Sequence, residues 1–520
     1  MIGMGALLAT PVLVWLALPG RFSFPLLLAV CLVPFLHRIQ TLGSVWKAWR
    51  CGLAVGAVMH VLQLYWIVSV LRQYGGLEWY LATPAMLLLC VYMGLYPAVF
   101  AAGFHYLVRS PQAIVPVLGG SALWVGLDWL RSWLFGGFPW MDVGYGLWSC
   151  PWLLQGVDLV GHYGLTFIIV MLNIVLLTSL QRTRPVMQRV IGASVCVVII
   201  GSWLSYSAVR GQQVDDLIVS ADKAALGIVQ GNVEQTRKWS PEERLRTVKD
   251  YVRLSDDLLE SGPASLVVWP ETALPFYPRR DELLQPLIDM VWEKHVSVLS
   301  GAPWYEVEED RTKRLVRYYN GAMLMDPSTS FVVGYYKSHL VPFGEYVPLK
   351  KYLPFIAPLV EAAGDFTAGR IDRTLDAGVI RSGVLICYES IFGEIGRAWV
   401  KAGANLLINL TNDAWYGKSS APHQSWAMTV YRAVETRRSL LRSANTGISG
   451  YIDPTGAIGI ESELFEQWAA TVTVPLLDVQ TIFVGGGYLF APLNGMLALL
   501  LVFVTAAGTG RRRDNLGEPK

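Results

Sequence analysis

The stretch Gly383-Val384-Leu385-Ile386-Cys387-Tyr388-Glu389-Ser390 joins a short apolar run to a polar turn. A short apolar run with such an end predicts a buried strand. The thiol of Cys387 would then stand where that strand meets the turn. Cys387 is also the only cysteine in the charged middle of the chain, because the other five lie in the apolar first two hundred residues. It is therefore a candidate nucleophile.

Two other local patterns supply the groups that a reactive thiol needs. Val267-Val268-Trp269-Pro270-Glu271 predicts a strand that runs into a carboxylate, and Tyr335-Tyr336-Lys337 places an ammonium shortly before the turn Pro342-Phe343-Gly344-Glu345. A carboxylate can act as general base, and an ammonium can stabilise an oxyanion. Taken singly, Cys387 would be a small buried hydrophobe, Glu271 a helix-start carboxylate and Lys337 a surface charge. Together they indicate a site for acyl chemistry.

From about residue 210, short apolar runs alternate with amphipathic stretches, which predicts an α/β domain. Ser240-Pro241-Glu242-Glu243 predicts a helix start, with Ser240 as N-cap and Glu243 completing a capping box, and a helix that runs to about Glu260. A second helix is predicted from Gly393 to Ala402. The predicted strands are Ala225–Val229, Leu266–Trp269, Val296–Ser300, Gly321–Met325, Gly383–Cys387 and Leu406–Leu410.

The rest of the chain is strongly apolar. Hydrophobic residues make up 53% of the 520 residues and charged residues only 16%, against about 25% charged residues in soluble domains. Because a membrane-spanning helix needs about 20 apolar residues, windows free of charged residues predict eight spans, seven before the α/β domain and one after it. Those windows are 4–19, 22–36, 51–71, 80–108, 113–127, 163–180, 190–209 and 479–510.

Basic residues indicate the orientation of these spans. With eight spans, the basic connections all fall on one side, which the positive-inside rule assigns to the cytoplasm. The basic residues are Arg38, Lys47, Arg50, Arg109, Arg182, Arg184, Arg189 and Arg511 to Arg513. We therefore expect a bundle over 1–209, an external catalytic domain over 210–485, and a last span with a basic cytoplasmic tail over 486–520. A net charge of +2 gives no case for a nucleic acid partner.

The order of the three blocks resembles the nitrilase superfamily, in which Glu271, Lys337 and Cys387 match the catalytic residues. Together with the spans around them, they resemble the apolipoprotein N-acyltransferase family, a membrane-embedded branch of that superfamily. The matching stretches are Gln230-Gly231-Asn232, Trp239, Trp269-Pro270-Glu271-Thr272, Lys337 through Pro348, Cys387-Tyr388-Glu389, Asn409 through Gly417 and Arg442 through Gly447.

This resemblance implies an αββα sandwich domain attached to an eight-span helical bundle. It implies transfer of an acyl chain from a phospholipid to the α-amine of an S-diacylglyceryl-cysteine in an apolipoprotein, without cofactor or metal. It also implies a multi-pass protein of the bacterial inner membrane with a periplasmic catalytic domain.

The resemblance also implies a role for each matching side chain. Glu271 would be the base and Cys387 would carry a thioester, while Lys337 and a backbone N–H near Tyr388 would stabilise the oxyanion. Glu345 would orient Lys337 or a substrate amine. Glu389, Trp239 and Tyr388 match family positions that support the three catalytic residues. The expected mouth for an acyl chain comprises Phe343, Tyr346, Trp415 and Tyr416.

Other functions stay open at this point. A membrane-tethered amidase would use the same three residues to hydrolyse an amide. A Cys-His protease would pair Cys387 with His295, His339 or His423. A transporter would need ionisable residues inside its spans, and only Asp128 and Arg131 come near one. The aromatic stretch from Phe135 to Trp152 predicts either an interfacial belt or a lipid-entry segment.

Overall fold

The computed structural model describes residues 2–181, 183–235, 238–278, 282–310, 313–328, 333–347 and 365–515. The chain divides into two compact units. The first comprises Met1–Val68, Glu78–Arg210 and Gly485–Lys520, and the second comprises Ser69–Leu77 and Gly211–Val484. The second unit therefore takes a short segment from the middle of the apolar region.

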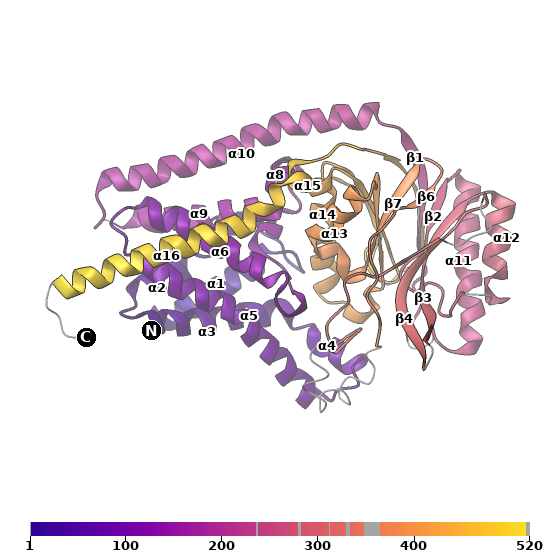
Figure 1. The fold of residues 1–520 in the computed structure, drawn as a ribbon, viewed down its shortest axis with the longest axis horizontal. Coiled ribbons are helices and arrows are strands. Elements are labelled where there is room, and N and C mark those ends of the chain that lie inside the picture. Colours follow the sequence, from indigo (N-terminus) through magenta and orange to yellow (C-terminus); the bar gives the residue numbers. More distant parts are fainter. Residues whose placement is uncertain are drawn as a thin grey trace. The chain divides into compact units, whose positions relative to one another are not determined.

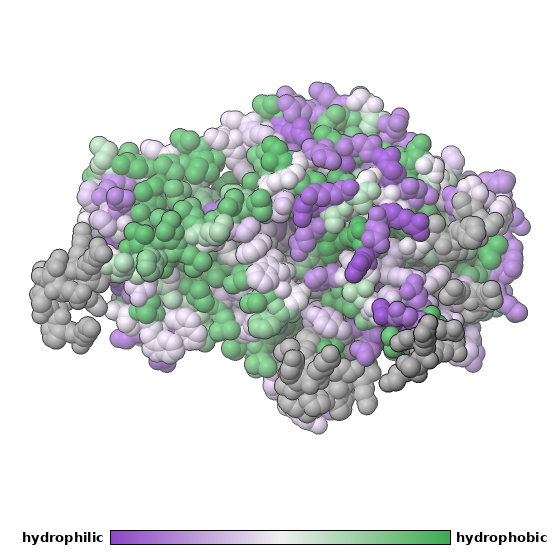
Figure 2. Space-filling view, viewed as in Figure 1, coloured by the Kyte–Doolittle hydropathy of each residue, from purple (hydrophilic) through white to green (hydrophobic). Residues whose placement is uncertain are grey.

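The first unit is helical (Figure 1). Its longer helices are α1 (Ile2–Ala17), α2 (Val33–Thr41), α3 (Val45–Leu64), α5 (Trp79–Leu107), α6 (Ile114–Arg131), α9 (His162–Leu180), α10 (Val186–Ser220) and α16 (Phe490–Asn515). Its short helices are η1 (Pro25–Ala29), η2 (Leu134–Gly136), η3 (Val143–Leu147), α7 (Pro151–Leu154), α8 (Val157–Val160) and η8 (Gly487–Leu489). Figure 2 shows apolar residues covering α16 and the helices beside it.

Small residues let two of these helices pack closely. A Cβ added to Gly52 of α3 would lie 2.4 Å from the backbone oxygen of Pro97 in α5, and one added to Gly94 would lie 2.9 Å from the nitrogen of Ala57. Such distances leave no room for a side chain. The glycines therefore permit the close backbone approach that is common between helices in membranes.

The predicted count of eight spans is not confirmed. Among the described residues, four helices are long and apolar enough to cross a membrane: Trp79–Leu107, His162–Leu180, Val186–Ser220 and Gly487–Gly508. The helices Val45–Leu64 and Ile67–Gln73 (α4) form a pair bent by 55° that would make a fifth. The apolar helices Leu8–Ala17 and Pro25–Thr41 are shorter than the roughly 20 residues that usually cross a hydrocarbon core.

The segment from Phe135 to Trp152 is largely enclosed within the first unit. Trp140 and Tyr145 are buried, whereas Phe135 and Trp152 are exposed. Buried Asp142 accepts hydrogen bonds from Arg131 and from His162, the latter at 2.9 Å. A purely interfacial aromatic belt is therefore too simple a description, because Trp140 and Tyr145 belong to the core.

The second unit contains two six-stranded mixed sheets. The first has the order β12-β1-β2-β3-β4-β5 and the second β11-β10-β9-β8-β7-β6. The strands of the first sheet are β1 (Lys223–Gln230), β2 (Leu266–Val268), β3 (Ser297–Asp310), β4 (Lys313–Met325), β5 (Val333–Tyr336) and β12 (Trp468–Pro475). Those of the second are β6 (Leu375–Ala377), β7 (Ile380–Ile386), β8 (Leu406–Thr411), β9 (Ser439–Ala444), β10 (Gly450–Ile452) and β11 (Ile458–Glu461).

Helices flank both sheets (Figure 1). The helices α11 (Pro241–Ser261) and α12 (Gln285–Lys294) lie beside the first sheet, and α13 (Gly393–Lys401) and α14 (Ala421–Thr436) beside the second. The unit also includes the short η4 (Glu282–Leu284), η6 (Cys387–Ile391), η7 (Asp413–Tyr416) and α15 (Ile482–Gly485). This arrangement confirms the predicted α/β fold, and both of its sheets are mixed.

The predicted strands are all present, and two of them are much longer than expected. The predicted segment Val296–Ser300 corresponds to β3, which begins at Ser297 and continues to Asp310, and Gly321–Met325 lies in β4, which begins at Lys313. Their outer halves mix charged and aromatic residues with a few aliphatic ones, so they lack a long apolar run. The predicted capping box was wrong, because the Ser240 side chain makes no cap hydrogen bond and Glu243 N bonds to Ser240 O at 3.2 Å.

Candidate active site

Cys387 follows the last residue of β7 and begins η6. Its φ angle is 51°, in the left-handed region that a side chain with a Cβ rarely adopts. The hydroxyl of Ser390 donates to its carbonyl oxygen at 3.0 Å, which fixes the turn. The thiol is thus presented by a strained backbone at the end of a buried strand, and such strain is common at functional sites.

Glu271 lies just past β2 and is buried. The strand end is held by Trp269, whose indole N–H donates to Ser255 at 2.9 Å. A Cβ on Gly301 of β3 would lie 2.6 Å from the Cα of Glu271, so only glycine lets β3 pack against this turn. These contacts place the carboxylate firmly at the end of the first sheet.

Lys337 follows β5 and is almost completely buried. Its ammonium contacts both oxygens of Glu345, at 3.0 Å to Oε1 and 2.9 Å to Oε2. Glu345 Oε2 also accepts the backbone N–H of Val341 at 2.9 Å. The structure therefore places Glu345 against Lys337.

Asn320 of β4 connects these groups and was missed by sequence reasoning. Its amide Nδ2 donates at 2.8 Å to Glu271 Oε1 and also at 2.8 Å to Glu345 Oε1. Its backbone oxygen accepts the N–H of Lys337 at 2.9 Å. The only sequence signal is a polar residue just before the apolar run Gly321–Met325, which by itself indicates no function.

The charges of Glu271, Lys337 and Cys387 act on one another. Burial raises the pKa of the Cys387 thiol to about 12; Glu271 adds to this and Lys337 opposes it. Burial also raises the pKa of Glu271, with Lys337 acting in the opposite direction. Burial alone would lower the pKa of Lys337, but Glu345 and Glu271 raise it above its usual value. At neutral pH the site therefore holds a thiol and an ammonium, and attack by sulfur requires a base.

A second lysine was also missed. Lys238 is buried, and its ammonium donates to the backbone oxygen of Glu271 at 3.4 Å. Burial lowers its pKa to about 8, although Glu271 opposes that effect. In the sequence, Lys238 looks like an ordinary charge beside Trp239, because nothing local shows that it is enclosed.

Glu389 ties the Lys337 segment to the Cys387 turn. Its Oε1 accepts hydrogen bonds from the backbone N–H groups of Ser338 and His339, at 2.7 and 3.0 Å, and from the Tyr335 hydroxyl at 2.7 Å. Its Oε2 accepts the N–H of Ile386 at 2.7 Å. The side chain is completely buried. This geometry indicates that Glu389 positions both segments.

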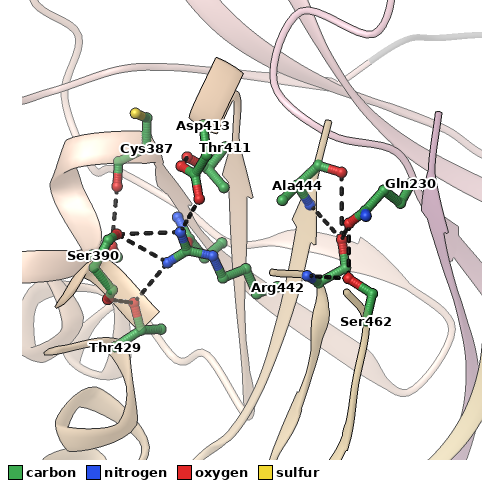
Figure 3. A network of polar contacts seen from close by, with 12 residues as sticks. Gln230, Cys387, Ser390, Thr411, Asp413, Thr429, Arg442, Ala444 and Ser462 are labelled. Atoms are coloured by element: carbon green, nitrogen blue, oxygen red, sulfur yellow. Dashed lines mark hydrogen bonds and ion pairs between the residues drawn. The ribbon is translucent and has the colours of Figure 1, made fainter. Parts of the chain in front are cut away.

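A buried arginine, Arg442, lies in a polar network near the Cys387 turn (Figure 3). Arg442 of β9 donates to Asp413 at 2.7 Å, to Ser425 at 3.1 Å and to Thr429 at 3.1 Å. Asp413 also accepts the hydroxyl of Thr411 at 2.8 Å. Asp413 and Arg442 form a buried ion pair. The network holds the loop after β8 against the central strands of the second sheet.

The remaining predicted residues differ in environment. Tyr388 is buried and packs edge-on against Phe392, 5.0 Å between ring centres. Trp239 and Phe343 are exposed, and Phe343 has a φ of 62°. Tyr346 and Tyr416 are partly buried. Pro348, at the end of the predicted loop, lies outside the described residues.

Trp415 is covered by a residue from far along the chain. The Tyr74 ring lies edge-on to it at 4.4 Å, and the Tyr74 hydroxyl donates to Ala414 O at 2.9 Å. Both residues belong to the second unit. The loop after β8 therefore has a partner that its own sequence context does not indicate.

The structure gives no support to a protease or a metal site. The strongest electrostatic influences on Cys387 are Glu271 and Lys337, rather than a histidine. His339 packs against Phe392 at 4.1 Å, and His295 ends α12. Within the described ranges, no group of three or more His, Cys, Asp or Glu side chains could hold a metal ion.

Two family models match most of the chain. Residues 11–175 match the apolipoprotein N-acyltransferase N-terminal domain, and residues 225–482 match carbon-nitrogen hydrolase. The apolipoprotein N-acyltransferase of Geobacter metallireducens is 38% identical over 456 residues, covering 86% of this chain and 84% of that protein. That of Methylococcus capsulatus is 34% identical over 475 residues, covering 88% and 89%.

Proposed function

The chain belongs to the apolipoprotein N-acyltransferase family, and from this premise we propose its reaction. It takes an acyl chain from a phospholipid, holds it as a thioester on Cys387, and transfers it to the α-amine of the S-diacylglyceryl-cysteine that begins an apolipoprotein. The chain is an acyltransferase with a nitrilase-type domain. The observation that supports this route best is the network joining Glu271, Asn320, Glu345 and Lys337.

The first half-reaction forms the thioester. Because burial raises the pKa of Cys387 to about 12, its proton passes to Glu271 as sulfur attacks the ester carbonyl. Lys337 stabilises the oxyanion that develops. The ester C–O bond then breaks, and the proton on Glu271 moves to the departing alcohol oxygen of the lysophospholipid.

The second half-reaction uses the same base. The α-amine of the acceptor attacks the thioester carbonyl while Glu271 removes one of its protons. The C–S bond breaks, an N–C bond forms, and the proton returns to the Cys387 sulfur. The ion pair between Lys337 and Glu345 keeps the ammonium in place through both steps.

Hydrolysis by an amidase with the same residues is not favoured. The relatives that match most of this chain are named apolipoprotein N-acyltransferases, and the apolar helices fit a protein whose substrates both carry acyl chains. Water would have to replace the amine in the second step. Analysis of the product, N-acyl peptide against free fatty acid, separates the two reactions.

The membrane arrangement is part of the proposal. We place eight spans in the bacterial inner membrane, with the short apolar helices crossing beside the long ones, both termini in the cytoplasm and residues 210–485 in the periplasm. The basic connections support this orientation. Reporter fusions near residues 45, 185 and 515 should read cytoplasmic, and one at residue 310 external. The opposite result at 310 would exclude exported lipoproteins as substrates.

Mass spectrometry of the intact protein tests the central step. Purified with phospholipid and without acceptor, the protein should carry a labile acyl adduct on Cys387. Cys387→Ala should carry none and should fail to acylate a diacylglyceryl-peptide. Normal acylation by this variant would disprove the assigned nucleophile.

A further inference from the structure

Two buried hydrogen-bond acceptors stand without a donor in the site. In the part of the chain that the structure describes, neither Glu271 Oε2 nor Asn320 Oδ1 has a hydrogen-bond partner. The two residues are only 7% and 8% exposed. Buried acceptors in proteins nearly always have a hydrogen-bond donor, because burying one without a donor costs the full free energy of its desolvation. Two such atoms on side chains that are hydrogen-bonded to each other therefore indicate that a ligand supplies the missing donors.

The orientation of the Asn320 amide follows from its neighbours. Its other polar atom, Nδ2, lies 2.8 Å from the Oε1 atoms of both Glu271 and Glu345. Ionised carboxylates only accept hydrogen bonds, so the NH₂ group must face them. The Oδ1 atom then makes no hydrogen bond to either carboxylate and can only accept.

The other acceptors and cations of this site are already engaged. Both oxygens of Glu345 contact Lys337, and Glu345 Oε2 also accepts from Val341. Lys238 donates to the backbone of Glu271. Among the described side chains of this network, Glu271 Oε2 and Asn320 Oδ1 are thus the acceptors that remain for a substrate.

We propose that Asn320 Oδ1 and Glu271 Oε2 together bind the two N–H groups of the acceptor amine, and that this pair selects a primary amine. The inference rests on the proposed function, since the acceptor there is an α-amine. A neutral primary amine has two N–H bonds and one lone pair. With an acceptor for each N–H, the lone pair is free to point at the thioester carbon.

The same arrangement accounts for both protons during transfer. Glu271 removes one amine proton as the N–C bond forms, and delivers it to the sulfur of Cys387 as the C–S bond breaks. The second N–H stays on Asn320 Oδ1 and becomes the N–H of the product amide. The leaving alcohol of the first half-reaction has a single O–H, so that step needs Glu271 alone.

The test compares two acceptors with two forms of the enzyme. One acceptor is an S-diacylglyceryl-cysteine peptide with a free α-amine, and the other is the same peptide with an N-methyl α-amine, which offers one N–H fewer. The wild-type enzyme should prefer the primary amine by about tenfold or more, the size expected when a buried acceptor loses its donor. The Asn320→Ala enzyme should acylate the two peptides at about equal rates.

Three controls make the result decisive. First, an acyl adduct on Cys387, measured by mass in the same preparation, shows that Asn320→Ala is folded. If Asn320→Ala does not fold, Asn320→Ser serves as the second variant. Glu345→Gln disturbs the same network but should keep the wild-type preference. A purely structural role for Asn320 predicts that both rates fall by the same factor and the preference survives, which overturns the inference. Equal rates for both peptides in the wild-type enzyme also overturn the inference. Absence of any acyl adduct in the wild-type enzyme overturns the proposed function itself.

Discussion

Glu389 Oε2 accepts the backbone N–H of Ile386, the residue before Cys387, at 2.7 Å. The other oxygen accepts donors from the residues that follow Lys337. One buried carboxylate thus sets the distance between the nucleophile turn on one sheet and the lysine segment on the other. Its role is to position the site, and that role can be separated from chemistry by substitution.

Glu389→Gln should lower both stability and activity. An amide cannot accept at both ends, so at least one buried N–H loses its partner, at a cost of about 1–3 kcal/mol in the free energy of unfolding. Thermal unfolding in detergent should show a lower midpoint, and acyl-adduct formation should slow. Unchanged stability with a complete loss of adduct would instead make Glu389 a catalytic group.

Glu271→Gln and Glu345→Ala should arrest different steps. Without the base, no thioester should accumulate, and the rate should fall by about 10²–10⁴-fold. Without Glu345, Lys337 loses its partner but Glu271 remains, so the acyl adduct should form and its transfer should slow. Intact mass measured over time distinguishes the two variants. A full adduct in Glu271→Gln would place the base elsewhere.

The acidic limb of the pH–rate profile should depend on Lys238. Glu271 acts when ionised, and its pKa is raised by burial, so activity should fall as pH drops through that raised pKa. The Lys238 charge lowers the pKa of Glu271. Lys238→Met should therefore shift the acidic limb of kcat/KM to higher pH, with little change above the Lys238 pKa of about 8. The same substitution at Lys249, which is exposed, should not shift it.

Trp415→Ala should impair the use of long-chain phospholipid far more than the reaction of Cys387 with a small, water-soluble thiol reagent. A buried contact between this ring and an acyl chain would be worth about 2–3 kcal/mol. Tyr74→Phe keeps the ring beside Trp415 but removes the hydrogen bond to Ala414, so it should have a smaller effect. Equal losses with both reagents would show that Trp415 supports the fold.

Gly447→Ala should disrupt the Arg442 network. A Cβ at this position would lie 2.1 Å from Asp413 Oδ2, the atom that pairs with Arg442. Moving that carboxylate leaves a buried guanidinium without its counter-ion, which costs about 3–5 kcal/mol. Gly485→Ala is the matched control, because nothing lies within 4 Å of its added Cβ. Similar unfolding midpoints for the two variants would contradict this account.

The residues proposed as catalytic could be read from the sequence because each lies at the end of a strand. Apolar runs mark such strands locally, and Glu271 and Cys387 were predicted at the ends of such runs. Lys337 follows β5, which was not predicted as a strand. Asn320 and Lys238 gave no comparable signal. One lies within a long strand and the other beside an exposed tryptophan, and only the packing of the second unit encloses them.

The spans were harder to predict for a related reason. A window without charged residues shows that a segment is apolar, but it does not show where a helix breaks. The window 51–71 contains the bend between Val45–Leu64 and Ile67–Gln73, and the windows 4–19 and 22–36 contain helices too short to satisfy a length criterion. Hydropathy therefore located the apolar unit, but the described helices do not confirm the count of eight spans.

The segment Ser69–Leu77 has a practical consequence for anyone who wishes to study the catalytic half in isolation. It belongs to the same compact unit as Gly211–Val484, although more than a hundred residues of mostly apolar chain separate them in the sequence. A gene fragment that begins at Gly211 would leave out Tyr74, and the indole of Trp415 would lose the ring that covers it. The complete second unit is therefore discontinuous in sequence. A soluble version of it would need this nine-residue segment, either added as a peptide or joined through a linker.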